Sequence, residues 1–247
     1  MNTIRDSITI IPDVHGRGFW KYAVKGKEEQ PIIFLGDYLD PYPQEDIDSE
    51  TAFEEFQAIV EFKKAHDGNV TLLLGNHDLQ YISRGNEASR YDSYRAFTFH
   101  DFFEDNADLF HMAYQCEDSA GRQYLLTHAG VHPGWVKAHP EVFRSFPKKS
   151  DNLAGYLNNL ASAPETKEGF NRILRDVSYV RMGWHEYGSM VWADVEEYAK
   201  AAPLFPDLFQ VFGHTQLMNQ IITRDYACLD CHAGFTLDRE GNFHKIL

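Results

Sequence analysis

Short runs of apolar, strand-forming residues recur along this 247-residue chain, and each run stops abruptly at polar side chains. The clearest run is residues 70–74, which lead through Gly75 into Asn76, His77 and Asp78. An uninterrupted run of this kind is typical of a strand that is buried on both faces inside an α/β sheet. Because ligands of such sheets bind beyond the carboxyl ends of the strands, these polar side chains are placed where chemistry takes place. Glycine, asparagine and aspartate also form ordinary turns, so one run alone would not distinguish a site from a turn.

Four more runs have the same form. Residues 7–12 lead into Asp13 and His15, and residues 31–35 lead into Asp37 and Asp40. Residues 124–127 lead into His128, and residues 208–212 lead into His214. A glycine beside most of these residues lets the backbone turn sharply. If the strands lie side by side, their ends bring together carboxylate and amide oxygens and imidazole nitrogens. The repeated pattern therefore predicts a metal site.

The segments between the runs predict helices and further strands. Residues 49–66 have an apolar face at helical spacing, which Asp48 or Ser49 can cap, and a shorter helix is expected near residues 17–25. Alternation of strand and helix is the signature of a layered α/β fold. Turn residues and short apolar runs predict a hairpin of residues 109–116 and 122–128, and strands at residues 219–223, 226–231 and 243–247.

The length allows one large domain or two small ones. The sequence contains no clear boundary, so we expect a single domain over residues 1–247. Helical insertions are expected around residues 79–107, where aromatic residues supply packing, and around residues 133–188, where the chain covers the site.

Composition argues against several classes of protein. Hydrophobic residues make up 43% and charged residues 24% of the chain, as in ordinary globular proteins, so disorder is not expected. No signal peptide or membrane-spanning stretch is visible, and a cytoplasmic location without membrane contact is expected by default. The net charge of −14 argues against binding to nucleic acid, which requires Lys and Arg to neutralise phosphates. It also argues against an anionic substrate unless bound divalent cations reverse the local charge.

The three cysteines, Cys116, Cys228 and Cys231, are too few for a disulfide framework and fit a reducing compartment. Residues 228–232 match the pattern by which c-type haem is attached. The missing export signal and the surrounding strand-and-turn pattern argue against haem. No thioredoxin-like unit surrounds the two cysteines to support a redox role.

The polar residues at the strand ends suit a centre of two divalent cations. Two cations roughly 3.5–4 Å apart can clamp the attacking and leaving oxygens during displacement at phosphorus. Such a pair needs a bridging carboxylate and separate ligands for each cation. Carboxylates, an amide oxygen and imidazoles suit Mn, Fe, Zn or Mg. The set available here is Asp13, His15, Asp37, Asn76, His128 and His214.

Five segments resemble, in chain order, the motifs of the calcineurin-like metallophosphoesterases. They are Asp13-Val14-His15-Gly16, Gly36-Asp37-Tyr38-Leu39-Asp40, Gly75-Asn76-His77-Asp78, Thr127-His128-Ala129-Gly130 and Gly213-His214-Thr215. Within that superfamily the chain resembles the phosphoprotein phosphatase branch and its bacterial relatives, the symmetrical diadenosine tetraphosphatases. Residues 190–194 and 228–234 also resemble segments of that branch. The resemblance implies a four-layer α/β/β/α sandwich of two mixed β-sheets flanked by helices.

The resemblance implies a role for each site residue. Asp13, His15 and Asp37 would bind the first cation, and Asp37, Asn76, His128 and His214 the second, with Asp37 as the bridge. The implied cofactors are two divalent ions, with Mn the first choice and Fe, Zn or Mg as alternatives. A hydroxide between the cations would attack phosphorus, His77 would protonate the leaving oxygen, and Asp40 would orient His77. Of the other histidines, we expect ordinary hydrogen-bonded roles for His66, His100, His111, His139 and His244, and leave His132, His185 and His232 open.

The sequence departs from the family pattern at two positions. Many members have an arginine that grips substrate phosphate directly after the second aspartate of the second motif, and this chain has Pro41 there. Much of the superfamily has a second histidine after Gly-His-x, whereas this chain has Gln216, as in the phosphoprotein phosphatase branch. We expect Arg181 to replace the missing arginine, with Arg84 and Arg90 as alternatives.

The expected function is hydrolysis of phosphate esters by a dinuclear metal-dependent enzyme. A protein phosphorylated on serine or threonine is the first substrate to consider, and a symmetrical dinucleoside tetraphosphate or a small phosphomonoester is the alternative. A hypothesis from another class is an inactive phosphoesterase-fold binding module, since fold alone does not fix function.

Overall fold

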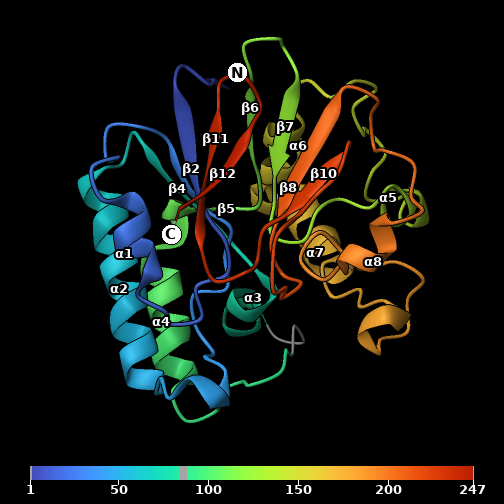
Figure 1. The fold of residues 1–247 in the computed structure, drawn as a ribbon. Coiled ribbons are helices and arrows are strands. Elements are labelled where there is room, and N and C mark those ends of the chain that lie inside the picture. Colours follow the sequence, from blue (N-terminus) through green and yellow to red (C-terminus); the bar gives the residue numbers. More distant parts are fainter. Residues whose placement is uncertain (1, 84–87, 247) are drawn as a thin grey trace.

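Two six-stranded β-sheets form the centre of the molecule and pack face to face between layers of helices (Figure 1). The structure is a computed structural model and describes residues 2–83 and 88–246. One sheet contains, in spatial order, β12 (Phe243–Ile246), β11 (Gly234–Asp238), β2 (Ser7–Ile11), β3 (Ile32–Phe34), β4 (Val70–Leu73) and β5 (Phe110–His111). The other contains β1 (Asn2–Thr3), β6 (Tyr114–Glu117), β7 (Gln123–Leu126), β8 (Leu208–Phe212), β10 (Tyr226–Cys228) and β9 (Ile221–Ile222).

Helices cover the outer face of each sheet (Figure 1). The first sheet is covered by α1 (Phe19–Val24), α2 (Ser49–Ala65) and α4 (Ala96–Asp105). The second is covered by α5 (Pro133–Ala138), α6 (Leu153–Ser162) and α7 (Pro164–Ile173), with α8 (Val195–Tyr198) beside them. The short helix α3 (Asn76–Ile82) lies below the sheets in the view of Figure 1. Three 3-10 turns complete the helical elements: Pro43–Glu45, Ala107–Leu109 and Tyr179–Arg181.

The pleat of the strands explains why their sequences are apolar throughout. In β3, Ile33 packs toward the second sheet, while Ile32 and Phe34 pack toward the helices of the first. In β4, Leu73 packs toward the second sheet and Leu72 packs toward the helices. Successive side chains of a strand point to opposite faces, so a strand between a sheet and a helical layer needs apolar residues at every position. The predicted four-layer α/β fold with two mixed sheets is confirmed.

The long helix α2 begins where its capping residue predicts. Oδ1 of Asp48 accepts a hydrogen bond of 2.7 Å from the backbone N–H of Thr51, which satisfies one of the free donors of the first turn. Phe56, Ile59 and Val60 are buried against the first sheet, as their helical spacing predicts. Among the described residues, no helix is both long and apolar enough to cross a membrane.

Two predicted strand assignments are wrong. Residues 109–116 do not form one strand, because β5 pairs with β4 in the first sheet and β6 pairs with β7 in the second. The chain crosses between the sheets at Met112 and Ala113, whose N–H groups both donate to Oδ1 of Asn158. The strand expected at residues 226–231 ends at Cys228 as β10, and a further strand, β11, begins at Gly234 and pairs with β2 and β12. Composition alone does not reveal these changes of partner.

Candidate metal centre

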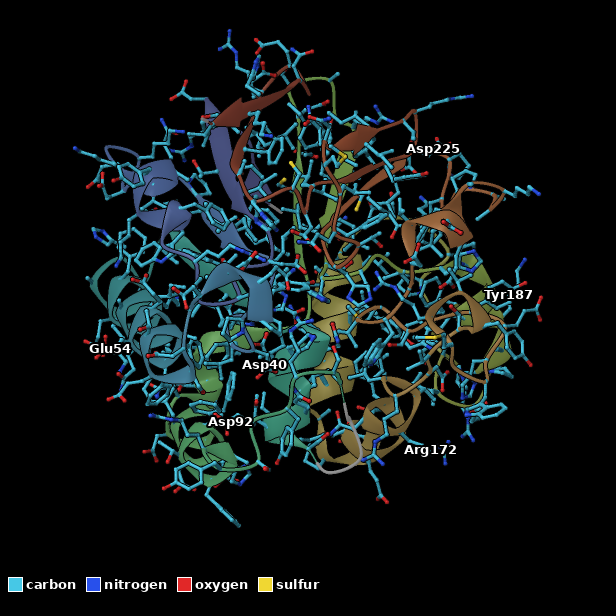
Figure 2. All side chains as sticks on the ribbon, turned by 60° about the horizontal axis from the view of Figure 1, so that its bottom comes forward. Asp40, Glu54, Asp92, Arg172, Tyr187 and Asp225 are labelled. Atoms are coloured by element: carbon cyan, nitrogen blue, oxygen red, sulfur yellow. The ribbon has the colours of Figure 1, made fainter. Side chains whose placement is uncertain are left out.

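The polar residues predicted at the strand ends converge at one end of the molecule. β2, β3 and β4 run parallel in one sheet, and β7 and β8 run parallel in the other. The loops that follow them place eight buried side chains together: Asp13, His15, Asp37, Asp40, Asn76, His77, His128 and His214. Figure 2 turns this end toward the viewer, with Asp40 near its middle.

Asp37 lies at the centre of the cluster. Its Oδ2 atom is 3.6 Å from Nε2 of His15 and 3.5 Å from Nε2 of His128. Nε2 of His128 lies in turn 3.0 Å from Oδ1 of Asn76 and 3.2 Å from Nδ1 of His214. One carboxylate oxygen from β3 is therefore close to imidazoles supplied by both sheets.

Two groups of three side chains could each hold a cation, and both include the same carboxylate: Asp37 with His15 and His77, and Asp37 with His128 and His214. The spacing of their atoms fits this use. Ligands bound to one cation at about 2.0–2.2 Å lie about 3–3.5 Å from each other, close to the spacing around Asp37. The residues present therefore fit a pair of divalent cations bridged by one carboxylate.

Backbone carbonyls fix the orientation of two of the rings. Nδ1 of His15 lies 2.7 Å from the carbonyl oxygen of Leu39, and Nδ1 of His128 lies 2.9 Å from that of Leu35. A carbonyl oxygen only accepts, so each Nδ1 carries the hydrogen and Nε2 of the neutral ring keeps its lone pair. Such hydrogen bonds to the outer nitrogen are characteristic of metal-binding histidines.

The atoms around His128 include more acceptors than donors. Its Nε2 lies 3.2 Å from Nδ1 of His214, a ring nitrogen that can donate to it, and it also faces Oδ2 of Asp37 and amide Oδ1 of Asn76. Nε2 of His214 is buried without a hydrogen-bond partner. Buried polar atoms usually have partners, and leaving them without one costs free energy. A cation would satisfy all of these lone pairs at once.

The backbone is strained at the same residues. His15, Asp37, Asp40 and His214 have φ angles of 46°, 54°, 60° and 63°. Residues other than glycine rarely adopt this left-handed region, and such strain tends to concentrate at functional sites. The loops are therefore held in conformations that aim these side chains into the cluster at some cost in free energy.

Gly75 and Asp78 let the strand ends close around the site. A Cβ atom at position 75 would lie 2.1 Å from Oδ1 of Asp37 and 2.7 Å from Cε1 of His128, so only glycine fits. The carboxylate of Asp78 accepts backbone hydrogen bonds from Asp37 (2.8 Å), Tyr38 (3.0 Å) and Gly75 (2.8 Å). Asp78 thus ties two loops together and does not face the cations.

Asp13 lies beside the cluster and contacts a neighbouring loop. Its two carboxylate oxygens accept the backbone N–H of His214 at 2.9 and 3.1 Å. It belongs to neither of the two three-residue groups described above. Its use as a metal ligand stays a prediction.

His77 and Asp40 form a buried pair at the edge of the cluster. Nδ1 of His77 lies 2.8 Å from Oδ2 of Asp40, so the opposite ring nitrogen, Nε2, is directed into the site. The Asp40 carboxylate also accepts hydrogen bonds from the Tyr81 hydroxyl, at 2.5 Å, and from the amide of Gln80. The backbone N–H of His77 donates to Oδ1 of Asp37 at 2.9 Å, which fixes the pair relative to the central carboxylate.

The sequence reasoning missed Gln80 and Tyr81, although a signal was present. Both follow His77 at helical spacing of three and four residues, which places all three on one face of α3. That face meets Asp40.

The electrostatics show how costly charge is in this cluster without a cation. Burial, and after it the charge of Asp13, raises the pKa of Asp37 well above its usual value. Burial also lowers the pKa of His15, and the neighbouring imidazole of His77 and guanidinium of Arg90 lower it further. Every one of these shifts favours the neutral form, because desolvation penalises charge. Divalent cations would supply the missing counter-charge.

Two arginines reach the edge of the site. Nε of Arg181 lies 2.6 Å from Oδ2 of Asp194, and its Nη2 donates to Oγ1 of Thr215 at 3.1 Å. Nη2 of Arg90 lies 3.3 Å from Nε2 of His77. Arg84, the third arginine considered from the sequence, lies outside the described residues.

Comparison with known protein families identifies the family of this chain. The family model described as calcineurin-like phosphoesterase matches residues 7–218. The chain belongs to this family. The resemblance predicted from the five motifs is therefore confirmed, and with it the assignment of this calcineurin-like phosphoesterase as a phosphatase that hydrolyses phosphoric esters. No curated protein sequence matches the chain.

Solved structures of protein phosphatases share the fold of this calcineurin-like phosphoesterase. A cold-active protein tyrosine phosphatase superposes with a TM-score of 0.61 at 12% identity, over 97% of this chain and 78% of that one. A cold-active protein-tyrosine phosphatase of a psychrophile Shewanella has a TM-score of 0.58, 12% identity and coverage of 98% and 80%. A protein serine/threonine phosphatase from Saccharomyces cerevisiae, described as similar to human phosphatase PP5, has a TM-score of 0.54, 13% identity and coverage of 99% and 80%.

Proposed function

We propose that this calcineurin-like phosphoesterase is a phosphoprotein phosphatase that removes phosphate from serine and threonine with the help of two divalent cations. One observation carries the proposal: a single carboxylate oxygen of Asp37 lies within 3.6 Å of the Nε2 atoms of both His15 and His128. A carboxylate shared in this way is what a pair of closely spaced cations requires.

The two cations would be held by separate sets of residues. Asp13, His15 and Asp37 would hold one, and Asp37, Asn76, His128 and His214 the other. Oxygen and imidazole ligands suit Mn, which is our first choice, as well as Fe, Zn and Mg. When bound, the cations would supply positive charge for the phosphoryl oxygens. They would also lower the pKa of bound water to about 7.

His77 and Asp40 would manage the proton of the leaving group. The Asp40 carboxylate holds Nδ1 of His77, so Nε2 is the nitrogen that can deliver a proton. Transfer of that proton to the departing serine or threonine oxygen gives a neutral alcohol and leaves a neutral imidazole. Tyr81 and Gln80 hold Asp40 in place from the opposite side.

The neighbours with solved structures bear on the choice of substrate. The solved neighbours are protein phosphatases by their descriptions, and this favours a phosphorylated protein as the partner. A dinucleoside tetraphosphate remains the second substrate to test. The burial of His15, Asp37, His77, His128 and His214 in two possible metal-binding groups supports an active enzyme over an inactive binding module.

The test is phosphate release by protein stripped with a chelator and then reloaded with Mn²⁺. The substrates are an aryl phosphate, a phosphothreonine peptide, a phosphotyrosine peptide and diadenosine tetraphosphate. Asp37→Asn serves as the inactive variant and Asp176→Asn, a buried aspartate far along the chain, as its matched control. The proposal predicts Mn-dependent release from the phosphothreonine peptide that disappears only in Asp37→Asn.

Other results redirect the assignment. Faster cleavage of diadenosine tetraphosphate than of any peptide would overturn the proposed substrate and keep the metal-dependent reaction. Absence of release from all four substrates with any divalent metal would leave the binding module as the better account.

A further inference from the structure

Arg90 contacts both the segment before Pro41 and the histidines of the metal centre. Its Nε donates a hydrogen bond of 2.9 Å to the backbone carbonyl of Asp40, the residue directly before Pro41. Its Nη2 extends to 3.3 Å from Nε2 of His77 and 3.5 Å from Nε2 of His15. A guanidinium from residue 90 thus lies at the mouth of the metal centre, about 50 positions away in sequence from the segment it serves.

Tyr42 holds this guanidinium in place. The central carbon of the Arg90 guanidinium lies 3.8 Å from the centre of the Tyr42 ring, the distance of a close cation–π contact. The Tyr42 ring also packs edge-on against His15, with ring centres 5.1 Å apart. Tyr42 therefore connects the arginine to a side chain of the cluster.

The segment that carries Arg90 is fixed at several points. The backbone N–H of Ala88 donates to Oε1 of Gln80 at 3.0 Å, and that of Asp92 donates to the Tyr81 hydroxyl at 2.9 Å. The Asp92 carboxylate accepts a hydrogen bond of 2.6 Å from Ser49. Arg90 itself has a φ angle of 62°, a strained backbone conformation that the neighbouring contacts maintain. Figure 2 labels Asp92 and Asp40 on this side of the molecule.

The charge of Arg90 is available to a ligand. Within residues 2–83 and 88–246, Arg90 forms no ion pair with a carboxylate, whereas Arg17 lies 2.8 Å from Glu45 and Arg181 lies 2.6 Å from Asp194. The contacts of Arg90 are a carbonyl, an aromatic face, a weak 3.4 Å contact to Ser89 and two imidazole nitrogens. A guanidinium offers five N–H donors in a planar fork that matches the oxygens of a phosphate.

We propose that Arg90, stacked on Tyr42, binds the phosphoryl oxygens of the substrate in place of the arginine that Pro41 removes. The inference rests on the proposed function for the identity of the ligand as a terminal phosphate. Arg181 approaches from a different segment, where its Nη2 contacts Thr215 and the carbonyl of His214. Arg90 and Arg181 are then two separate contributors, and of the two only Arg181 forms an ion pair within the described part of the chain.

The test measures binding of inorganic phosphate to the Mn-loaded protein by calorimetry, together with KM and kcat for an aryl phosphate. Charge-assisted hydrogen bonds of this kind correspond to roughly 10- to 100-fold in affinity, so Arg90→Ala is expected to raise the phosphate Kd and KM by that factor. Metal content is expected to stay at the wild-type level. Arg90→Lys keeps the charge without the fork, and we expect it to recover only part of the affinity.

Two further variants separate binding from general structure. Tyr42→Leu removes the stacking surface and is expected to weaken phosphate binding by a few-fold, since an exposed cation–π contact is worth about 0.5–1 kcal/mol. Arg95→Ala removes an arginine of the same segment that pairs with Glu50 at 3.0 Å, and we expect wild-type phosphate binding.

The outcomes distinguish this inference from the proposed function. Phosphate affinity and KM that are unchanged in both Arg90→Ala and Arg90→Lys would overturn the role of Arg90, even if the enzyme is active. Loss of metal in Arg90→Lys would also overturn it, by showing that Arg90 supports the cluster instead of the substrate. If wild-type protein binds phosphate through Arg90 but cleaves no ester, the proposed function fails and the role of Arg90 stands.

Discussion

Two buried clusters of histidine and aspartate exist in this molecule, and they are built in opposite ways. The cluster around Asp37 joins loops that follow strands of both sheets. The cluster around Asp176 lies within the helical insertion of residues 133–188, where Oδ2 of Asp176 accepts hydrogen bonds from Trp135 (3.0 Å) and His139 (2.5 Å). Its Oδ1 lies 3.4 Å from Nε2 of His185.

The difference between the clusters lies in how donors and acceptors are matched. Around Asp176, every contact sets an N–H group against a carboxylate oxygen, so the network is complete without any ligand. Around Asp37, acceptor atoms of Asp37, Asn76 and His128 face one another, and Nε2 of His214 has no hydrogen-bond partner among the described residues. Residue type alone therefore does not identify a metal site. The unmatched lone pairs do.

The largest effect expected from this comparison is on turnover. Asp37→Asn weakens the only carboxylate shared by both groups, and we expect it to lower kcat by roughly 10³-fold or more. Asp176→Asn makes the same chemical change in the other cluster, and we expect kcat within about threefold of wild type because the network there touches no reacting group. Steady-state hydrolysis of an aryl phosphate by both variants, with circular dichroism to verify folding, checks the contrast. Equal losses in the two variants would erase the distinction between the clusters.

The next effect concerns the Asp40–His77 pair, which has matched hydrogen bonds and yet lies beside the residues that would hold the cations. His77→Asn removes the proton donor, and general acid catalysis of this kind is worth about 10²-fold or more in kcat. We expect the bound metal to stay at the wild-type level, which elemental analysis of the same samples measures. Loss of metal from His77→Asn would assign His77 to the ligands and not to the proton transfer.

The same pair predicts a pH dependence of stability in the metal-free protein. Burial raises the pKa of Asp40 to about 7, against 3.8 ordinarily. A raised pKa means that the folded state binds the proton more tightly, so the stabilisation is complete below pH 3.8 and is lost as the pH rises through about 7. Between these limits Asp40 should lower the free energy of unfolding by about 1.4 kcal/mol for each pH unit.

Urea unfolding of chelator-stripped protein at pH 5, 6 and 7 measures this slope. Asp40→Asn cannot ionise and should lack the contribution, so wild type and variant should diverge as the pH rises. Parallel curves for the two proteins would show that Asp40 does not titrate in this range.

The smallest effect is on the stability of the Asp176 cluster. Asp176→Asn weakens the hydrogen bonds to Trp135 and His139, and we expect it to lower the free energy of unfolding by about 1–3 kcal/mol. Asp101→Asn, an exposed position on α4, serves as the control and should change it by less than about 0.5 kcal/mol. Urea unfolding at pH 7 compares the three proteins. If the free energy of unfolding changes no more in Asp176→Asn than in Asp101→Asn, the Asp176 cluster does not stabilise the fold.

The sequence predicted most of the framework because the strands are buried on both faces. Continuous apolar runs such as residues 70–74 leave no alternative element of that length, and the strand-end residues follow directly from the sheet. The division of residues 109–116 between β5 and β6 could not be predicted, because it depends on which sheet offers a free edge. Strand β11 begins at Gly234 directly after a bend, so the local pattern of the sequence did not predict it.

The candidate site shows the same limit at the level of single residues. Asp78 is an aspartate at a strand end, like Asp37, but it does not serve as a metal ligand. Its carboxylate accepts three backbone N–H groups and so holds two loops together. The sequence favours Arg181 over Arg90 for the contact with phosphate. Distances show that both reach the edge of the site, from segments that are far apart along the chain.

The most direct test of the central claim is the number of cations that one chain binds. Titration of chelator-stripped protein with Mn²⁺, followed by calorimetry and elemental analysis, measures this number for wild type, Asp37→Asn and Asp176→Asn. The shared carboxylate predicts two Mn²⁺ per chain for wild type and Asp176→Asn, and fewer than two for Asp37→Asn. One cation or none in the wild type, or two in Asp37→Asn, would contradict a centre bridged by Asp37.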